Sequence, residues 1–129
     1  MKKYIQSHKD LIVWQKAMDL VIEIYKLTQT FPKEELYGLS QQMRRAAIAI
    51  PSNIAEGYQR NHIKEYIQFL FIAKSSGSEL ETQLIITRRL HFGNPDQQIK
   101  AEELLTEIIK MLTKLISRLN SQKIPETNP

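Results

Sequence analysis

The longest periodic segment of the chain reads IKEYIQFLFIAKSSGSELETQLIITRRLH and covers residues 63–91. Within it, mostly apolar or small residues recur at alternating steps of three and four. That spacing keeps side chains on one face of an α-helix and is typical of helices that pack against other helices. The residues of this face are Ile63, Tyr66, Leu70, Ala73, Gly77, Leu80, Leu84 and Thr87. We therefore expect one long helix over about residues 62–91, with partners along its length.

Three further runs have the same period and are separated by residues that end helices. These runs cover residues 11–29, 41–59 and 95–119. Phe31-Pro32 ends the first run, since proline disfavours helix at the residue before it. Gly93 suits a helix C-terminus, and Asn94-Pro95 suits the start of the next helix. Because short connections favour antiparallel neighbours, the sequence predicts a single all-α domain over residues 1–129. It is expected to be an antiparallel up-down four-helix bundle with a flexible tail at residues 121–129.

Composition limits both the class of protein and its compartment. The chain has 129 residues, of which 42% are hydrophobic and 25% charged, as in an ordinary globular domain. It contains no cysteine, which excludes disulfides and thiolate metal sites. No segment approaches the roughly 20 uninterrupted apolar residues of a membrane span, and residues 1–10 are too polar for a signal peptide. We expect a cytoplasmic protein that does not associate with membranes.

The sequence predicts neither catalysis nor a cofactor site. His8, His62 and His91 are scattered, and none belongs to the Glu-x-x-His pair that di-iron bundles use. Phosphate-loop, zinc-protease and serine-hydrolase motifs are absent from the chain. Glu79 and Glu81 are two residues apart on a helix and diverge by about 200°, so they cannot grip one reacting group. We expect a protein that is not an enzyme and that binds no cofactor or metal.

Two segments are apolar on more faces than a single bundle core can cover. Residues 66–73 contain one polar member over two turns, and residues 46–50 contain none. A helix of an isolated bundle needs one apolar stripe, so the surplus predicts a second interface and hence a homo-oligomer. The alternative is a helix buried more deeply within a monomer. The residues expected at the oligomer interface are Ile48, Phe69, Phe71, Ile72, Glu79 and Glu81.

Three blocks of the sequence resemble one bacterial protein family. The first is LIVWQKA at residues 11–17, the second is YGLSQQMRRAA at residues 37–47 followed by IPSNIAEG at residues 50–57, and the third is GSELETQL at residues 77–84. Over about residues 9–93 the chain resembles the four-helix-bundle proteins named for open reading frames in 23S rRNA intervening sequences. The resemblance implies assembly as a ring, commonly a homopentamer. The family is also similar to the accessory proteins of diversity-generating retroelements, pentameric barrels for which binding of nucleic acid and of a reverse transcriptase is proposed.

Basic side chains are concentrated in the middle of the chain. The formal net charge is +4; residues 41–93 hold seven basic against four acidic side chains, whereas residues 94–129 hold five of each. Guanidinium groups bind phosphate oxygens through forked hydrogen bonds, so the middle segment predicts a nucleic-acid surface. The candidate contacts are Arg44, Arg45, Arg60, Lys64, Arg88 and Arg89.

Ion pairing is the competing interpretation for the first two of these residues. If the second and third helices fold back on each other, Arg44 and Arg45 come level with Glu79 and Glu81. Those carboxylates are then their natural partners, within the bundle or across a subunit boundary. Arg60, Lys64, Arg88 and Arg89 have no such obvious partners, although Glu56 precedes Arg60 by four residues, a spacing suited to pairing. These four residues are the better candidates for an exposed basic surface.

Two functions are compatible with these patterns. The leading hypothesis is an oligomeric, non-enzymatic protein that associates with nucleic acid, RNA or DNA, and chiefly with structured RNA. The alternative is a scaffold ring that recruits a protein partner and has no nucleic-acid role.

Overall fold

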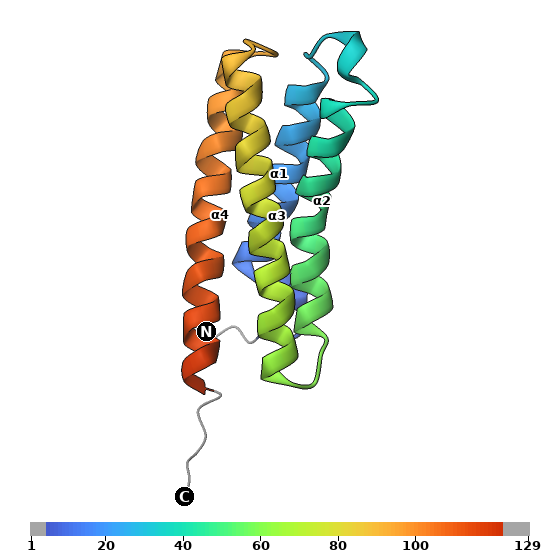
Figure 1. The fold of residues 1–129 in the computed structure, drawn as a ribbon. Helices are drawn as coiled ribbons and strands as arrows, with labels where there is room; N and C mark the ends of the chain where they lie inside the picture. The colour runs from blue at the N-terminus through green and yellow to red at the C-terminus, as the bar shows by residue number, and fades with distance from the viewer. Residues whose placement is uncertain (1–4, 123–129) are drawn as a thin grey trace, which may run out of the picture.

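The computed structural model describes residues 5–122, and every regular element in that part of the chain is helical. Long helices run alternately up and down in chain order (Figure 1). They are α1 (Ile12–Thr28), α2 (Leu39–Tyr58), α3 (Ile63–Arg89) and α4 (Pro95–Gln122), with short 3-10 turns η1 (His8–Asp10) before α1 and η2 (Lys33–Glu35) before α2. The all-α four-helix bundle that the periodicity predicts is confirmed.

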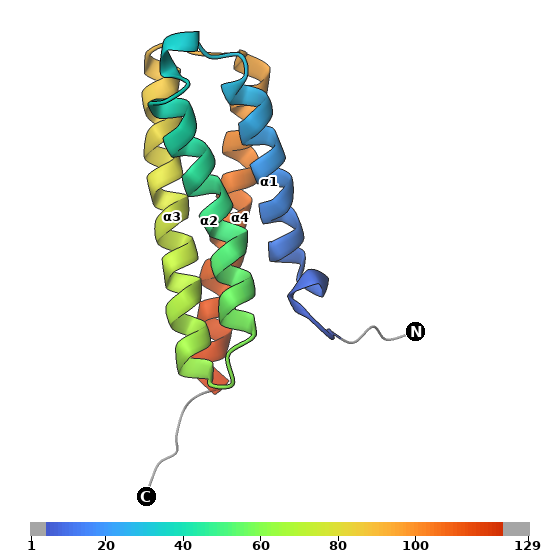
Figure 2. The same cartoon turned by 90° about the vertical axis from the view of Figure 1, so that its right-hand side faces the viewer.

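The helices form a four-sided bundle. Each helix packs against the next one in the chain, and α4 packs back against α1. The backbones of α1 and α3 do not approach each other closely, nor do those of α2 and α4. Figure 2 shows α1 and α3 on opposite sides, with α2 in front of α4. The bundle therefore has four outer faces, and the α1–α2 face is opposite the α3–α4 face.

The core follows the period of the sequence. In α3, the expected face is the buried one, with Leu70, Ala73 and Leu80 fully buried. The largest fully buried side chains come from all four helices and are Leu20, Ile24, Leu27, Met43, Ile50, Ile54, Leu70, Leu80, Leu84, Leu105, Ile108 and Leu112. Each contributes about 1.5–3 kcal/mol by leaving water, which is the main force that holds the helices together.

The connection between α3 and α4 closes the upper end of the bundle. The side-chain oxygen of Asn94 accepts hydrogen bonds from the backbone N–H groups of Asp96 and Gln97, at 2.9 and 3.1 Å, and so caps α4. Gly93 has a φ of +78°, the left-handed conformation expected after a helix. The Asn94 N–H donates to the Thr30 hydroxyl at 3.0 Å, which ties this connection to the end of α1.

The fourth helix extends beyond its expected end at Leu119. It continues to Gln122, because Ile116 and Leu119 are still buried against the bundle. Ser121 and Gln122 are therefore helical, and the rest of the expected tail, residues 123–129, lies outside the described residues. Among residues 5–122, no helix is both long enough and apolar enough to cross a membrane.

The second and third helices approach closely at Gly57. A Cβ atom added there would lie 2.7 Å from the Cβ of Phe69 and 3.1 Å from the carbonyl oxygen of Tyr66. The Tyr66 ring packs edge-on against Tyr58, with ring centres 5.9 Å apart. Burial, and to a lesser extent Tyr58, raises the pKa of Tyr66 to about 12. Only a glycine allows α2 and α3 to meet in this way.

Replacement of Gly57 by alanine should therefore destabilise the bundle by about 1–3 kcal/mol, as overpacking does. The added methyl meets a carbonyl oxygen and a Cβ, neither of which moves without its backbone. Gly77→Ala in the middle of α3 is the control, because alanine there gains about 1 kcal/mol in helix propensity without so close a contact. The methyl at Gly77 would lie 3.3 Å from Cγ1 of the flexible Ile109 side chain. Urea unfolding should show a lower midpoint for Gly57→Ala than for Gly77→Ala, and equal midpoints would contradict the close approach.

Candidate anion-binding pocket

Arg60, one of the expected nucleic-acid contacts, is neutralised by carboxylates. Its Nη2 atom lies 2.8 Å from Glu56 Oε2, one helical turn earlier, and its Nη1 atom lies 3.8 Å from Glu65 Oε1. The guanidinium also covers the ring of Phe69, at 4.7 Å from the ring centre. Arg60 therefore covers the lower end of the α2–α3 pair, and its charge is compensated by the two carboxylates.

Arg88 is also neutralised, which corrects the expectation that it has no obvious partner. Its guanidinium makes a bidentate pair with Glu102 of α4, in which Nε donates to Oε2 at 3.0 Å. The buried side chain of Gln98 donates to the same carboxylate at 2.8 Å. The bond from Arg88, followed by smaller contributions that include the bond from Gln98, holds the pKa of Glu102 below its usual range. A charge count over residues 41–93 misses this pair, because the carboxylate comes from the next helix.

Arg44 does not pair with Glu79 or Glu81 within the bundle, which corrects the first form of the ion-pair interpretation. Pairing across a subunit boundary stays a prediction. It lies toward α1, where its Nε donates to the Thr28 hydroxyl at 2.9 Å and its guanidinium carbon lies 4.4 Å from the centre of the Tyr25 ring. The hydroxyl donates in turn to a carbonyl one turn earlier in α1, at 2.7 Å. No hydrogen bond to residues 5–122 uses the terminal nitrogens of Arg44. Its orientation is thus fixed by uncharged partners, and its charge is not neutralised.

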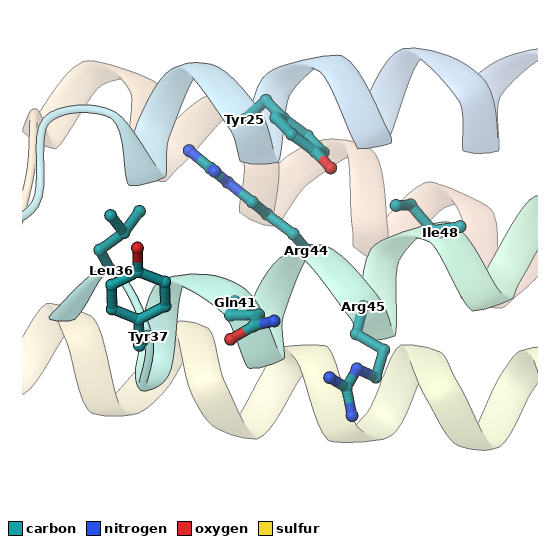
Figure 3. Close-up of a pocket in the computed structure, with 7 residues that line it drawn as sticks. All are labelled: Tyr25, Leu36, Tyr37, Gln41, Arg44, Arg45 and Ile48. Carbon is teal, nitrogen blue, oxygen red and sulfur yellow. The ribbon is translucent and has the colours of Figure 1, made fainter.

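Arg44 lines an open pocket between α1, the α1–α2 connection and the upper half of α2 (Figure 3). The pocket has a volume of about 430 Å³. Its lining residues are Tyr25, Leu36, Tyr37, Gln41, Arg44, Arg45 and Ile48. They include two cations and no carboxylate, and the phenol and amide groups add hydrogen-bonding capacity. This combination suits an anion that also has an apolar or aromatic part.

Arg45 diverges from Arg44. Successive residues of an α-helix point about 100° apart, and Figure 3 shows the Arg45 side chain directed toward α3 while Arg44 lies against α1. Arg45, Lys64 and Arg89 are exposed and form no ion pair within residues 5–122. Lys64 and Arg89 stand at opposite ends of α3, roughly 38 Å apart at 1.5 Å per residue. The six expected contacts therefore do not form one continuous basic face.

A second basic surface lies on the lower half of α4. The count of charged side chains over residues 94–129 predicts no net charge for this segment. Lys110, Lys114 and Arg118 recur at four-residue steps, so they lie along one side of the helix. They line a shallow groove of about 530 Å³ and pair with no carboxylate in the described part of the chain. The acidic residues of α4 lie in its upper part, where Glu102 and Glu107 are paired with other helices. The four-residue spacing is the signal that predicts this surface.

Three of the expected interface residues are exposed apolar side chains. Ile48, Phe71 and Ile72 are 42%, 49% and 47% exposed. Phe69 differs from them, because Arg60 covers its ring and it packs against α2. Phe69 is therefore half-buried, and it is not one of the exposed apolar residues.

Glu79 and Glu81 are exposed on α3 and form no ion pair within residues 5–122. Glu79 accepts one long hydrogen bond, 3.4 Å, from the side-chain amide of Gln83. The side-chain oxygen of Gln83 is buried and has no hydrogen-bond partner among the described residues. Both carboxylates are thus available to a group from outside the subunit.

Exposed apolar side chains occur on both of the opposite faces defined above. Met18 and Ile22 of α1 belong to the same stripe as Tyr25, which borders α2, and Ile48 of α2 lies on the same face. Ile85 of α3 lines a small cleft together with residues of α4, and Phe71 lies 14 residues earlier, which is about four turns along the same side of α3. The exposed fractions of Met18, Ile22 and Ile85 are 41%, 54% and 48%. Exposed apolar side chains therefore occur on two opposite sides of the bundle.

The pocket offers groups for binding rather than for reaction. Guanidinium, phenol, amide and aliphatic groups line it, with no nucleophile hydrogen-bonded to a base. Within residues 5–122, no group of three or more His, Asp or Glu side chains is placed to hold a metal ion.

Comparison with known proteins agrees with the resemblance seen in the sequence. The profile of the family described as "23S rRNA-intervening sequence protein" matches residues 9–114. A crystal structure of a protein of unknown function from the S23 ribosomal protein family of Bacteroides thetaiotaomicron is similar to this chain. The two chains are 25% identical with a TM-score of 0.75, and the similarity covers 81% of this chain and 98% of that one. No curated protein matches the chain.

Replacement of Glu102 by glutamine tests the Arg88–Glu102 pair. The pKa of Glu102 is lower in the folded protein than the value of about 4.3 in an unfolded chain. Its contribution to stability is therefore fully present above that value and is lost as the pH falls through the folded-state pKa. At pH 7 we expect Glu102→Gln to lower the free energy of unfolding by about 0.5–1 kcal/mol. Urea unfolding should show that this difference disappears in strong acid, while Glu103→Gln, at the exposed neighbouring residue, matches the wild type throughout.

Proposed function

Because this chain belongs to the 23S rRNA-intervening sequence protein family, we propose that it is a non-enzymatic, RNA-associated protein that acts as a homo-oligomeric ring. One observation carries the RNA part of the proposal. Arg44 is oriented by Thr28 and Tyr25 and presents unbonded terminal nitrogens to a pocket that has no carboxylate. The family name refers to sequences within 23S rRNA, which makes RNA the first ligand to test.

A guanidinium held in this way is suited to phosphate. It can donate two parallel hydrogen bonds to one phosphate group, which a lysine cannot do. At Arg60 and Arg88 a phosphate would have to displace a carboxylate, whereas at Arg44 it displaces only water. The row Lys110, Lys114 and Arg118 adds a positive field that attracts RNA from a distance. The affinity of such a protein falls as the salt concentration rises, because RNA binding releases counterions.

The positions of the exposed apolar residues favour a ring. The α1–α2 and α3–α4 faces are different surfaces on opposite sides of the bundle, so contact between them joins neighbours head to tail. Head-to-tail contacts close into rings when the rotation between neighbours allows it. The resemblance implies five subunits. Because the pocket opens at the upper end of the α1–α2 face, above Ile48, each subunit would carry one pocket at its boundary, and one RNA could engage several pockets with avidity.

A different feature favours the second candidate function, a scaffold ring that recruits a protein partner. Residues at the start of the described chain and the lower half of α4 enclose a mainly apolar cleft of about 510 Å³. Ile5 and Ile12 line it and are 53% and 59% exposed, and Lys114 and Arg118 line it as well. Apolar side chains of a protein would fill such a cleft better than phosphate groups would.

Arg44→Gln tests the RNA proposal, with Arg88→Gln as the matched control. Both changes remove one guanidinium, but only the first removes an unneutralised one. We expect Arg44→Gln to weaken binding of a fluorescein-labelled stem–loop RNA about tenfold or more, and Arg88→Gln to change it little. Fluorescence anisotropy measures both affinities, and wild-type affinity should fall steeply between about 50 and 200 mM salt. An intact ring with no detectable RNA binding at low salt would contradict this proposal and favour the scaffold function.

Two single substitutions test the head-to-tail ring. Ile22→Glu places a charge on the α1–α2 face, and Phe71→Glu places one on the α3–α4 face. Each variant should be monomeric by light scattering, because burial of an unpaired carboxylate at an interface costs several kcal/mol. An equimolar mixture should form a dimer, since each variant retains the face that the other has lost. A mixture that stays monomeric, or a monomeric wild type at micromolar concentration, would contradict the head-to-tail arrangement.

A further inference from the structure

Tyr37 is the most exposed large side chain at the pocket. Its exposed fraction is 86%, against 46% for Leu36 and 42% for Ile48. It stacks on no other aromatic ring of the described chain and makes no hydrogen bond there. A ring exposed to this degree contributes little to the core, because apolar area stabilises the fold only when it leaves water. The position of Tyr37 therefore has no explanation in the packing of the subunit.

The side chains around Tyr37 are of the kinds that bind nucleotides. Figure 3 shows Tyr37 beside Gln41, with Arg44 next along α2 and Ile48 at the far end. Within one pocket there is thus an open aromatic face, a side-chain amide with an unused donor and acceptor, and an oriented guanidinium. A nucleobase offers a flat face and a hydrogen-bonding edge, and its phosphate offers paired oxygens. Each kind of group in the nucleotide has a counterpart in the pocket.

We propose that this pocket binds an unpaired nucleotide of RNA, with the base stacked on the Tyr37 ring and the phosphate on the terminal nitrogens of Arg44. The inference rests on the proposed function and deepens it, because it names the part of the RNA that the pocket recognises. Gln41 lies between the two groups and meets the edge of the base. The basic row on the lower half of α4 is at the other end of the bundle, so its role is to attract other phosphates of the RNA without regard to sequence or pairing.

Stacking between base pairs excludes the same contact inside a duplex. Away from the helix ends, both faces of each base are covered by its neighbours, so stacking on Tyr37 there requires the base to be unpaired or flipped out. Proteins that recognise loops and single strands stack bases on aromatic side chains in this way. The pocket volume of about 430 Å³ falls within the roughly 300–1,000 Å³ range of sites for one small ligand. It is suited to one nucleotide rather than to the side of a helix.

The experiment compares one stem–loop RNA with a blunt duplex of the same stem sequence. Anisotropy is measured with the full-length wild type and with Tyr37→Ala, Tyr37→Phe and Arg44→Gln. We expect the wild type to prefer the stem–loop about tenfold, within the range that base–aromatic stacking supplies. Tyr37→Ala should lose that preference and keep its affinity for the duplex. Tyr37→Phe should retain the preference, because phenylalanine keeps the aromatic face.

A free nucleotide has the same chemistry, so adenosine 5′-monophosphate is titrated as a separate ligand. The proposal stands if it binds much more weakly than the stem–loop and competes with it only at high concentration. If it binds tightly while neither RNA binds, both the RNA proposal and this inference fail, and the pocket is one for a mononucleotide.

Three outcomes would overturn the inference while leaving RNA binding intact. The first is a wild type that binds loop and duplex equally. The second is a Tyr37→Ala variant that still prefers the loop although Arg44→Gln weakens binding. The third is dissociation of the oligomer by Tyr37→Ala, seen by light scattering, since Tyr37 would then be a subunit contact.

Discussion

The close contact of α2 with α3 at Gly57 is the constraint on which the surface of this protein depends. With no side chain at that position, the Cβ of Phe69 and the carbonyl of Tyr66 take the space that a methyl group would need. The α2-facing side of α3 is thereby buried at its lower end, and Arg60 folds over Phe69 and pairs with Glu56 and Glu65. The apolar residues of α3 that do not face α2 or the core, such as Phe71 and Ile72, are left exposed. Of the surplus apolar side chains of α3 noted in the sequence, Phe69 is thus covered by this contact, whereas Phe71 and Ile72 stay exposed.

The fold follows from local patterns, which is why the sequence predicts it well. An apolar period and a cap such as Asn94 depend on residues within a few positions of one another, and both are found as expected. The last three helical residues of α4, residues 120–122, could not be predicted in the same way. They depend on Ile116 and Leu119 being covered by other helices, which is a property of the assembled bundle.

The contacts of the charged residues cannot be predicted from local sequence patterns in the same way. The register of α2 and α3 predicts Glu79 and Glu81 as partners of both Arg44 and Arg45, but adjacent residues on a helix point about 100° apart. Only one of them can face α3, and the other must face α1, where Thr28 and Tyr25 receive it. The pair between Arg88 and Glu102 joins residues on different helices, and counting charges along the sequence cannot find it. The pocket depends on three separate segments, so its existence could not be read from any one motif.

Three arginines of this bundle fall into two groups, according to the kind of side chain that holds each one in place. Carboxylates fix Arg60 and Arg88, and the resulting ion pairs have no net positive charge. A hydroxyl and an aromatic ring fix Arg44, and such partners lower the entropy of the side chain without neutralising it. A ligand at Arg44 therefore meets a guanidinium that is already oriented and still charged, so less conformational freedom is lost on binding. The same division explains why the total of +4 says little about function: what matters is which cations the fold leaves both ordered and unpaired.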